Sequence, residues 1–341
     1  ILKDIYRCHP DVICFSCYIW NISFVRELVP DLKKILPQVE FWAGGPEVSY
    51  DAVEFLKKNP VFFGVMVGEG EETFHELAGY YIERKPETLS EIRGVAFRDE
   101  NKGRDIVHTG WRELMDLSKV PFAYSNLTEF KNRIIYYESS RGCPFSCSYC
   151  LSSIDKKLRF RDIELVKKEL QFFIDNKVPQ VKFVDRTFNC KHDHAMAIWR
   201  YITEHDNGIT NFHFEISADL LREEELALMK TMRPGLIQLE IGVQSTNPQT
   251  IKAIRRTMDF EKLKGIVEQI HSFGNIHQHL DLIAGLPYEG YDSFHKSFCD
   301  VYALRPEQFQ LGFLKVLKGS HMMEMTGEYQ ILYKDREPYE V

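Results

Sequence analysis

The chain has 341 residues, of which 43 are basic and 50 are acidic, giving a formal net charge of −7. Its hydrophobic content of 44% and charged content of 27% exclude a disordered, collagen-like or coiled-coil chain, and no apolar run reaches the roughly 18–20 residues of a membrane helix. Eight cysteines are too sparse for a disulfide scaffold. At roughly 100–200 residues per domain, the length predicts two or three domains. The acidic balance argues against a nucleic-acid partner, and no membrane partner is expected.

Neither end of the chain carries a targeting signal. Residue 1 is Ile, and no basic segment followed by an apolar run precedes the first strand-like stretch. We therefore expect a cytoplasmic protein. We interpret the sequence as part of a longer chain, with a processed native terminus as the alternative.

The first part of the chain alternates strand-like runs with helical stretches. Strands are predicted at residues 11–16, 39–43 and 61–67, and residues 92–98 and 105–109 are typical of a hairpin. The alternation predicts a parallel, doubly wound α/β sheet. Ligands of such sheets bind beyond the carboxyl ends of the strands. The residues at those ends are Ser16, Cys17, Gly44, Gly45, Gly68, Glu69 and Gly70.

Glycines at the strand ends would let the backbone approach a flat or phosphate-bearing ligand closely. The dinucleotide fingerprint GxGxxG is not met, because Glu71, Glu72 and Thr73 follow Gly70 without a third glycine. A role in tight turns alone is the alternative.

The runs FSCYIWN, GGPEVSY and GEGEETF resemble the cobalamin-binding domain found upstream of many radical enzymes. The resemblance implies a Rossmann-like domain over residues 1–110, lacking its first strand, and a linker over residues 111–133. It also implies that the strand-end residues named above bind cobalamin. The histidine motif that ligates cobalt in that family would lie upstream of residue 1.

Three cysteines lie within eight residues, in the pattern CxxxCxxC formed by Cys143, Cys147 and Cys150. On a helix they would share one face, but Gly142 and Pro144 favour a loop wrapped around a ligand. Three thiolates can hold three irons of a 4Fe–4S cluster and leave the fourth iron open. A structural zinc site is the alternative, although zinc usually takes four protein ligands and no fourth Cys or His lies nearby in the sequence.

This loop, with the aromatic Tyr149 before its last cysteine, resembles that of the radical S-adenosylmethionine (SAM) superfamily. The resemblance implies that the three cysteines hold the cluster and that the open iron binds the amino and carboxylate groups of SAM. Electron transfer to the sulfonium would release a 5′-deoxyadenosyl radical, which takes a hydrogen atom from the substrate. The electron donor would be a flavodoxin or a ferredoxin.

Strands and helices continue to alternate after the cysteines. A helix over residues 260–273 is expected to stop at Gly274. Including the strand before the cysteines, six strands are predicted, and the last five lie at residues 181–185, 212–217, 236–242, 277–284 and 308–316. Six strands cannot close an eight-stranded barrel. The superfamily's core is a six-strand partial barrel, expected here over residues 134–318, and residues 319–341 resemble the start of a C-terminal extension.

Polar residues lie on or after several of these strands. By resemblance, the candidate SAM contacts are Tyr149, Asp185, Glu215, Gln244, Arg256 and Asp281. Carboxylates and an amide can hold ribose hydroxyls, and a guanidinium can hold the SAM carboxylate. A salt bridge or a strand-end cap is the alternative for each. Arg255 could replace Arg256, and Glu240 is a further carboxylate that could face inward.

The two resemblances together predict a cobalamin-dependent radical SAM methyltransferase that methylates an unactivated carbon, with a 4Fe–4S cluster, SAM and cobalamin as cofactors. One SAM would methylate cobalt and another would generate the substrate radical. The alternative is cyclisation, rearrangement or oxidation without methyl transfer, and a different class is a non-catalytic cobalamin or metal carrier. The other five cysteines are expected to be buried apolar groups. No catalytic residue is assigned, and the substrate, a small molecule or a peptide, is not marked.

Overall fold

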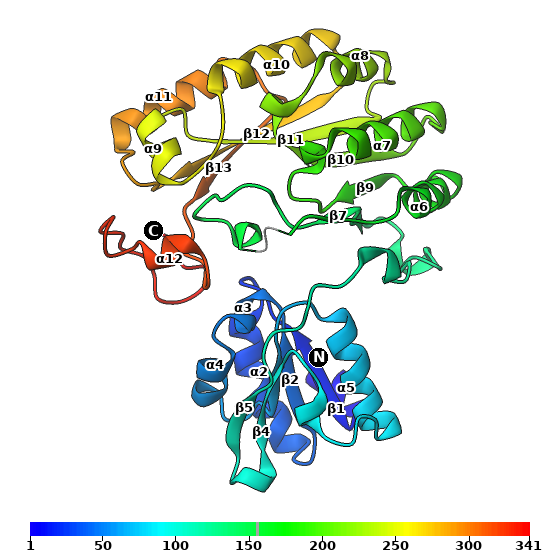
Figure 1. Ribbon diagram of the computed structural model, residues 1–341, viewed down its shortest axis with the longest axis vertical. Coiled ribbons are helices and arrows are strands. Elements are labelled where there is room, and N and C mark those ends of the chain that lie inside the picture. The colour runs from blue at the N-terminus through cyan, green and yellow to red at the C-terminus, as the bar shows by residue number, and fades with distance from the viewer. Residues whose placement is uncertain (155–156) are drawn as a thin grey trace. The chain divides into compact units, whose positions relative to one another are not determined.

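The computed structural model describes residues 1–154 and 157–341, which divide into two compact units (Figure 1). The N-terminal unit comprises residues 1–115 and 333–340, and the barrel unit comprises residues 116–332 and 341. Among the described residues, no helix combines the length and the apolar character needed to cross a bilayer.

A five-stranded sheet forms the centre of the N-terminal unit. Its strands lie in chain order: β1 (Val12–Ser16), β2 (Glu40–Gly44), β3 (Gly64–Met66), β4 (Val95–Asp99) and β5 (Asp105–His108). The first three are parallel, whereas β4 is antiparallel to β3 and β5 to β4. The α/β class is confirmed, but the sheet is mixed rather than wholly parallel. The chain returns to the end of β3, where the Val67 N–H donates to the Gly94 carbonyl (2.7 Å), so β4 starts there and runs back.

Helices cover both faces of this sheet. α2 (Ile22–Ile35) and α4 (Ala52–Lys58) pack on one face and α5 (Glu71–Glu83) on the other (Figure 1). The alternation of β2 explains the two cores, because Phe41 and Ala43 are buried with α2 and α4, whereas Trp42 is buried with α5. The two remaining helices are α1 (Leu2–Arg7) and α3 (Pro46–Ser49).

The barrel unit is built on a curved sheet of six parallel strands, as the sequence predicts. From one edge to the other they are β13 (Gln308–Phe313), β12 (His277–Ala284), β11 (Ile237–Gln244), β10 (Asn211–Ile216), β9 (Gln180–Phe183) and β6 (Ile135–Tyr137). Every neighbouring pair is parallel. A separate two-stranded ribbon pairs β7 (Ser140–Arg141) with β8 (Arg159–Phe160).

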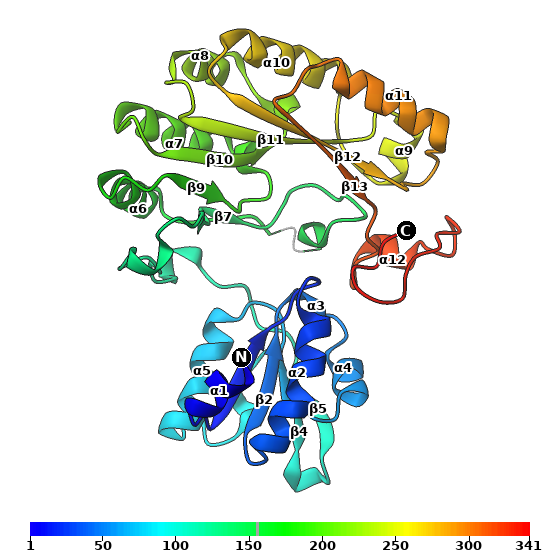
Figure 2. The same cartoon turned by 180° about the vertical axis from the view of Figure 1, so that it is seen from behind.

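Helices lie along the outer face of the six-stranded sheet, as Figures 1 and 2 show from opposite sides. They are α6 (Ile163–Asp175), α7 (His192–Glu204), α8 (Glu223–Thr231), α10 (Phe260–Phe273) and α11 (Tyr291–Tyr302). Two short helices, α9 (Pro248–Ala253) and α12 (His321–Glu324), follow β11 and β13. Gly274 ends α10 in the left-handed conformation (φ +68°), which confirms the predicted stop.

Because successive side chains of a strand point to opposite faces of the sheet, one set lies in the core and the other faces the site. On β10, Phe212, Phe214 and Ile216 are buried among the hydrophobic residues under the helices. The residue between the last two, Glu215, therefore points to the opposite, inner face of the sheet. The same alternation places Glu240 and Asp281 on that inner face, beside the apolar residues of β11 and β12.

Candidate functional site

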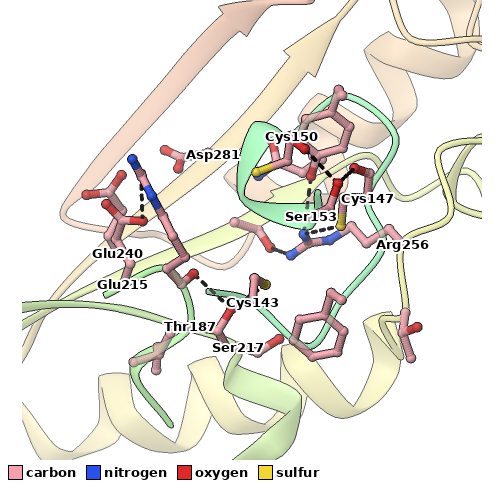
Figure 3. Close-up of a pocket in the computed structure, with 17 residues that line it drawn as sticks. Cys143, Cys147, Cys150, Ser153, Thr187, Glu215, Ser217, Glu240, Arg256 and Asp281 are labelled. Carbon is pink, nitrogen blue, oxygen red and sulfur yellow. Dashed lines mark hydrogen bonds and ion pairs between the residues drawn. The ribbon is translucent and has the colours of Figure 1, made fainter. Parts of the chain in front are cut away.

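The three clustered cysteines come together at one pocket of the barrel unit. Cys143 and Cys147 are buried, Cys150 is half-buried, and none of the three forms a disulfide. The Ser153 hydroxyl holds the turn closed, because it lies within hydrogen-bond distance of the carbonyls of Cys147 (2.9 Å) and Cys150 (2.6 Å). Figure 3 shows the three side chains facing the pocket from a single loop. Three convergent thiols can supply three ligands to an iron–sulfur cluster and leave one iron open.

Arg256 places a guanidinium beside these thiols. Its Nη1 lies 3.9 Å from the Cys147 Sγ and 3.3 Å from the Tyr149 hydroxyl, and its Nη2 donates to the Gly242 carbonyl. Burial raises the pKa of the Cys147 thiol, and the nearby Arg256 charge only partly opposes this rise. Arg255 is exposed and does not line the pocket, so the structure places Arg256 at the site. A fixed cation at this point can hold thiolates or a ligand carboxylate.

Three carboxylates enter the same pocket from neighbouring strands: Glu215 on β10, Glu240 on β11 and Asp281 on β12. Figure 3 shows Glu215 and Glu240 at one side of the pocket and Cys147 and Cys150 at the other. Glu215 and Glu240 are directly paired in the parallel ladder. The pocket therefore offers soft sulfur donors on one side and hydrogen-bond acceptors on the other.

Glu215 and Glu240 differ in charge despite being neighbours. Burial raises the pKa of Glu215 to about 7, and Arg186, 3.7 Å away, only partly opposes the effect. His213, whose Nε2 lies 3.0 Å from the Glu240 carboxylate, and Lys182, which donates to it at 2.9 Å, lower the pKa of Glu240 to about 2. One carboxylate is therefore fully ionised at neutral pH and the other is close to its midpoint.

Glu240, His279 and Asp281 bring ligand atoms within 4.8 Å of one another and could hold a metal ion. The partners that these residues already have in the protein explain the cluster without a metal ion. Lys182 and His213 already pair with Glu240, and the His279 Nε2 lies 3.0 Å from an oxygen of Asp281. We interpret the group as an ion-pair network that orients the pocket carboxylates.

Gln244 lies at a bulge in β11, where the pairing with β12 shifts register. Its backbone has a φ of +72°, a conformation that a non-glycine residue adopts rarely. Its buried Oε1 has no hydrogen-bond partner among the described residues. Since buried polar atoms are almost always paired, this oxygen is available to accept a hydrogen bond from a ligand group or a water molecule.

Asp185 does not reach the pocket, in contrast to its predicted contact with SAM. Strand β9 ends at Phe183, and the buried Asp185 carboxylate accepts hydrogen bonds from the Ser139 N–H (2.9 Å), the Ser139 hydroxyl (2.6 Å) and the Ser140 hydroxyl (2.6 Å). The carboxylate thus anchors the chain just before the cysteine loop.

Several pocket residues were not among the predicted contacts. They are Phe145, Ser153, Arg186, Thr187, Ile216, Ser217, Gly242 and Thr257. Arg186 and Thr187 directly follow the predicted contact Asp185, and the Thr187 hydroxyl lies 3.7 Å from the Cys143 Sγ. The position of residues 185–187 just after a strand indicated that this segment lies near the site. It could not show which of these three side chains faces the pocket.

Replacing Asp185 with alanine is expected to lower the free energy of unfolding of the barrel unit by about 2 kcal/mol, because a buried N–H and two hydroxyls lose their acceptor. Thermal unfolding of the cofactor-free protein measures the effect. Asp162→Ala is the matched control, since that carboxylate only caps α6 through two backbone N–H groups and should cost about 1 kcal/mol. Equal losses in the two variants would contradict the anchoring role of Asp185.

The predicted cobalamin residues lie at the carboxyl ends of β1, β2 and β3 in the N-terminal unit. Gly45 has a φ of +102°, and a Cβ there would lie 2.6 Å from the Cys17 carbonyl oxygen, so only glycine fits. Ser16 and Gly70 are exposed, and a Cβ on Gly70 would meet nothing within 4 Å. Backbone from two of the strand ends is therefore open to a ligand.

Three of these residues face the protein itself. The Cys17 side chain is fully buried, and burial raises its pKa to about 11, so only its backbone is available to a ligand, unlike the predicted contact. A Cβ on Gly68 would lie 3.1 Å from the Trp111 ring, and Glu69 accepts a hydrogen bond from the Met115 N–H (3.5 Å).

The remaining cysteines are less buried than predicted. Cys17 is buried and Cys190 is half-buried, whereas Cys8, Cys14 and Cys299 are exposed. Their positions at a helix end, in the edge strand β1 and on α11 leave one side open to solvent.

Family models match both units of the chain. Residues 137–299 match the radical SAM superfamily, and residues 1–78 match the B12 binding domain. Together the two models cover more than half of the chain. The cofactors of these families are a 4Fe–4S cluster and SAM for the first and cobalamin for the second.

Curated relatives agree with these models. The cobalamin-dependent radical SAM methyltransferase TokK of Streptomyces tokunonensis is 27% identical over 306 residues, which are 84% of this chain and 44% of that protein. The 2-(S-pantetheinyl)-carbapenam-3-carboxylate methyltransferase of Streptantibioticus cattleyicolor is 27% identical over 304 residues, with the same shares. The chain therefore spans less than half the length of these two relatives.

A solved structure shares the fold. The radical SAM methyltransferase TsrM from Kitasatospora setae, with cobalamin and a 4Fe–4S cluster bound, superimposes with a TM-score of 0.76 and 16% identity. The match covers 96% of this chain and 69% of that chain. The family models confirm the two resemblances in the sequence. The chain carries a B12-binding domain, matched over residues 1–78, followed by a radical SAM domain, matched over residues 137–299.

Proposed function

We propose that this chain is part of a cobalamin-dependent radical SAM methyltransferase that acts on an unactivated carbon. The observation that carries the proposal is the pocket in which three unbridged cysteines face an arginine and three carboxylates. The same chain carries glycine-rich strand ends typical of a cobalamin site. The relatives TokK and the carbapenam-carboxylate enzyme, both named as methyltransferases, support this choice of reaction.

Cys143, Cys147 and Cys150 would hold three irons of the cluster. The fit rests on their convergence at one pocket without a disulfide and on the soft thiolate ligands that such clusters take. Cys190 does not line the pocket as the structure describes it, so a four-cysteine zinc site gains no support. The open coordination position would face the arginine and carboxylate side, where SAM can reach it.

Arg256, Gln244, Glu215 and Asp281 would hold SAM. The unpaired Oε1 of Gln244 and the buried guanidinium of Arg256 fit the polar groups of an amino acid moiety. Carboxylates at Glu215 and Asp281 suit ribose hydroxyls, and Tyr149 lies beside Arg256. Glu240, held ionised by Lys182 and His213, adds a fixed negative charge that favours a cationic sulfonium.

Ser16, Gly44, Gly45, Gly68 and Gly70 would form the cobalamin face, with Cys17 and Glu69 contributing backbone only. The fit rests on the left-handed Gly45 and on the open surface at Gly70, which let a broad, flat ligand approach the main chain.

When bound, the cluster with SAM supplies a 5′-deoxyadenosyl radical and cobalamin supplies a methyl group. The chain's own side chains bind and orient these groups. Arg256 would neutralise negative charge next to the thiolates, and Cys143 and Cys147 lie buried in the pocket wall. A flavodoxin or ferredoxin would deliver electrons, and the substrate would be a small molecule or a peptide.

Anaerobic reconstitution with iron, sulfide and hydroxocobalamin tests the proposal. The protein should bind about four irons per chain and one corrinoid, detected by its visible absorbance. With dithionite and SAM it should form both 5′-deoxyadenosine and S-adenosylhomocysteine. A protein that binds hydroxocobalamin but forms neither product would be a carrier rather than an enzyme.

Cyclisation or oxidation without methyl transfer is the second candidate. A relative named anaerobic magnesium-protoporphyrin IX monomethyl ester cyclase, from Synechocystis, is 25% identical over 66% of this chain. Formation of 5′-deoxyadenosine without S-adenosylhomocysteine would favour this reaction over methyl transfer.

A further inference from the structure

The C-terminal segment, residues 333–340, packs as part of the N-terminal unit although it follows the barrel unit in sequence. Tyr339 is only 5% exposed there. Its hydroxyl donates to the Oε1 of Glu47 (2.5 Å) and lies 3.1 Å from the Oε1 of Glu337. Arg26 on α2 pairs with the same oxygen of Glu337 at 2.7 Å. The segment is thus held by a buried polar cluster rather than by loose surface contacts.

Glu47 belongs to α3, the short helix that directly follows Gly44 and Gly45. Its N–H donates to the Cys17 carbonyl (3.4 Å), which ties α3 to the end of β1. In the same helix, the Ser49 hydroxyl donates to the Gly45 carbonyl (2.8 Å) and accepts from the Gly68 N–H (3.2 Å). One four-residue helix therefore links the ends of all three parallel strands.

A helix this short is not stable by itself and depends on contacts from elsewhere in the fold. The Tyr339–Glu47 hydrogen bond is such a contact, and it reaches a carboxylate that is only 5% exposed. Burial and the carboxylates of Glu47 and Glu337 raise the pKa of Tyr339, so the hydroxyl stays protonated and remains a donor.

We propose that Tyr339 is a positioning residue for the corrinoid face: through Glu47 it holds α3, and through α3 it keeps the three strand ends in one arrangement. The inference rests on the proposed cobalamin role of these strand ends. It adds residues 333–340 to the corrinoid-binding unit, beyond the segment that matches the B12 binding domain. Loss of the contact would populate arrangements that cannot bind, and apparent affinity falls in proportion to the competent fraction.

Tyr339→Phe removes only the hydroxyl and is the test variant. Tyr81→Phe is its matched control, because the Tyr81 hydroxyl donates to a carboxylate of the same unit, Glu40, and accepts from the Trp42 indole N–H (2.8 Å). Glu40 begins β2, whereas Gly44 ends it. Both variants lose a tyrosine–glutamate hydrogen bond, but only the first loses it beside the strand ends.

Two measurements on the 341-residue chain decide the matter. Without corrinoid, hydrogen–deuterium exchange at the amides of Cys17, Glu47 and Gly68 should rise on the order of tenfold in Tyr339→Phe and stay unchanged in Tyr81→Phe. In a hydroxocobalamin titration, the Kd of Tyr339→Phe should rise about tenfold and that of Tyr81→Phe should not change.

Unchanged exchange in Tyr339→Phe, or faster exchange with unchanged hydroxocobalamin affinity, would overturn the inference. Equal weakening of binding in both variants would also overturn it, because it would reduce the effect to general destabilisation of the unit. If the wild-type chain binds no hydroxocobalamin, the proposed function fails first, and the exchange measurement alone then decides whether Tyr339 positions α3.

Discussion

Replacing Cys147 with alanine is expected to remove most of the bound iron and to abolish reductive cleavage of SAM. Two thiolates cannot hold the three irons that the cysteine loop would bind. Cys147 is buried beside Arg256, so no solvent-exposed group can take its place. Iron and sulfide analysis after anaerobic reconstitution, with chromatographic detection of 5′-deoxyadenosine, measures both effects.

Cys190→Ala is the control for this prediction. Cys190 is a half-buried cysteine of the same unit that does not line the pocket. Its variant should keep about four irons per chain, as expected for a cluster held by three cysteines. A Cys147→Ala protein with a full cluster, or a Cys190→Ala protein without one, would contradict the proposed ligand set.

Replacing Arg256 with methionine is expected to weaken SAM binding on the order of 100-fold. The guanidinium lies at the junction of the cysteine loop and β11, 3.9 Å from the Cys147 sulfur and hydrogen-bonded to Gly242. Truncating one member of a buried charged pair costs about 2–5 kcal/mol. A loss of about 2.7 kcal/mol, which lies within this range, corresponds to roughly 100-fold in Kd. Equilibrium binding of SAM to the reconstituted protein gives the Kd.

Arg255→Met separates a specific role of Arg256 from a general loss of positive charge. Arg255 is the adjacent residue, and it is exposed and outside the pocket. Its variant should bind SAM as tightly as the wild type and keep its iron. Similar losses in the two variants would show that net charge, rather than the buried guanidinium, accounts for the effect.

The sequence by itself determined the features that depend on local chemistry. The CxxxCxxC spacing brings three thiols into one loop because all three lie within eight consecutive residues. Gly274 ends its helix because glycine adopts the left-handed conformation easily. The alternation of strands and helices likewise predicted the six parallel strands. A strand followed by a helix is a local pattern, and its repetition along the chain is typical of a parallel sheet.

The tertiary structure decided which side chains face the sites. Asp185 turns to Ser139 and Ser140, whereas the next two residues line the pocket, because the strand ends two residues earlier and its alternation no longer applies. Cys17 continues the face of Ile13 and Phe15, and it is buried because α2 and α4 cover that face of the sheet. No local pattern marks the contact of Tyr339 with Glu47, which are 292 residues apart. Such contacts depend on how the whole chain packs, and short-range propensity and periodicity carry no information about them.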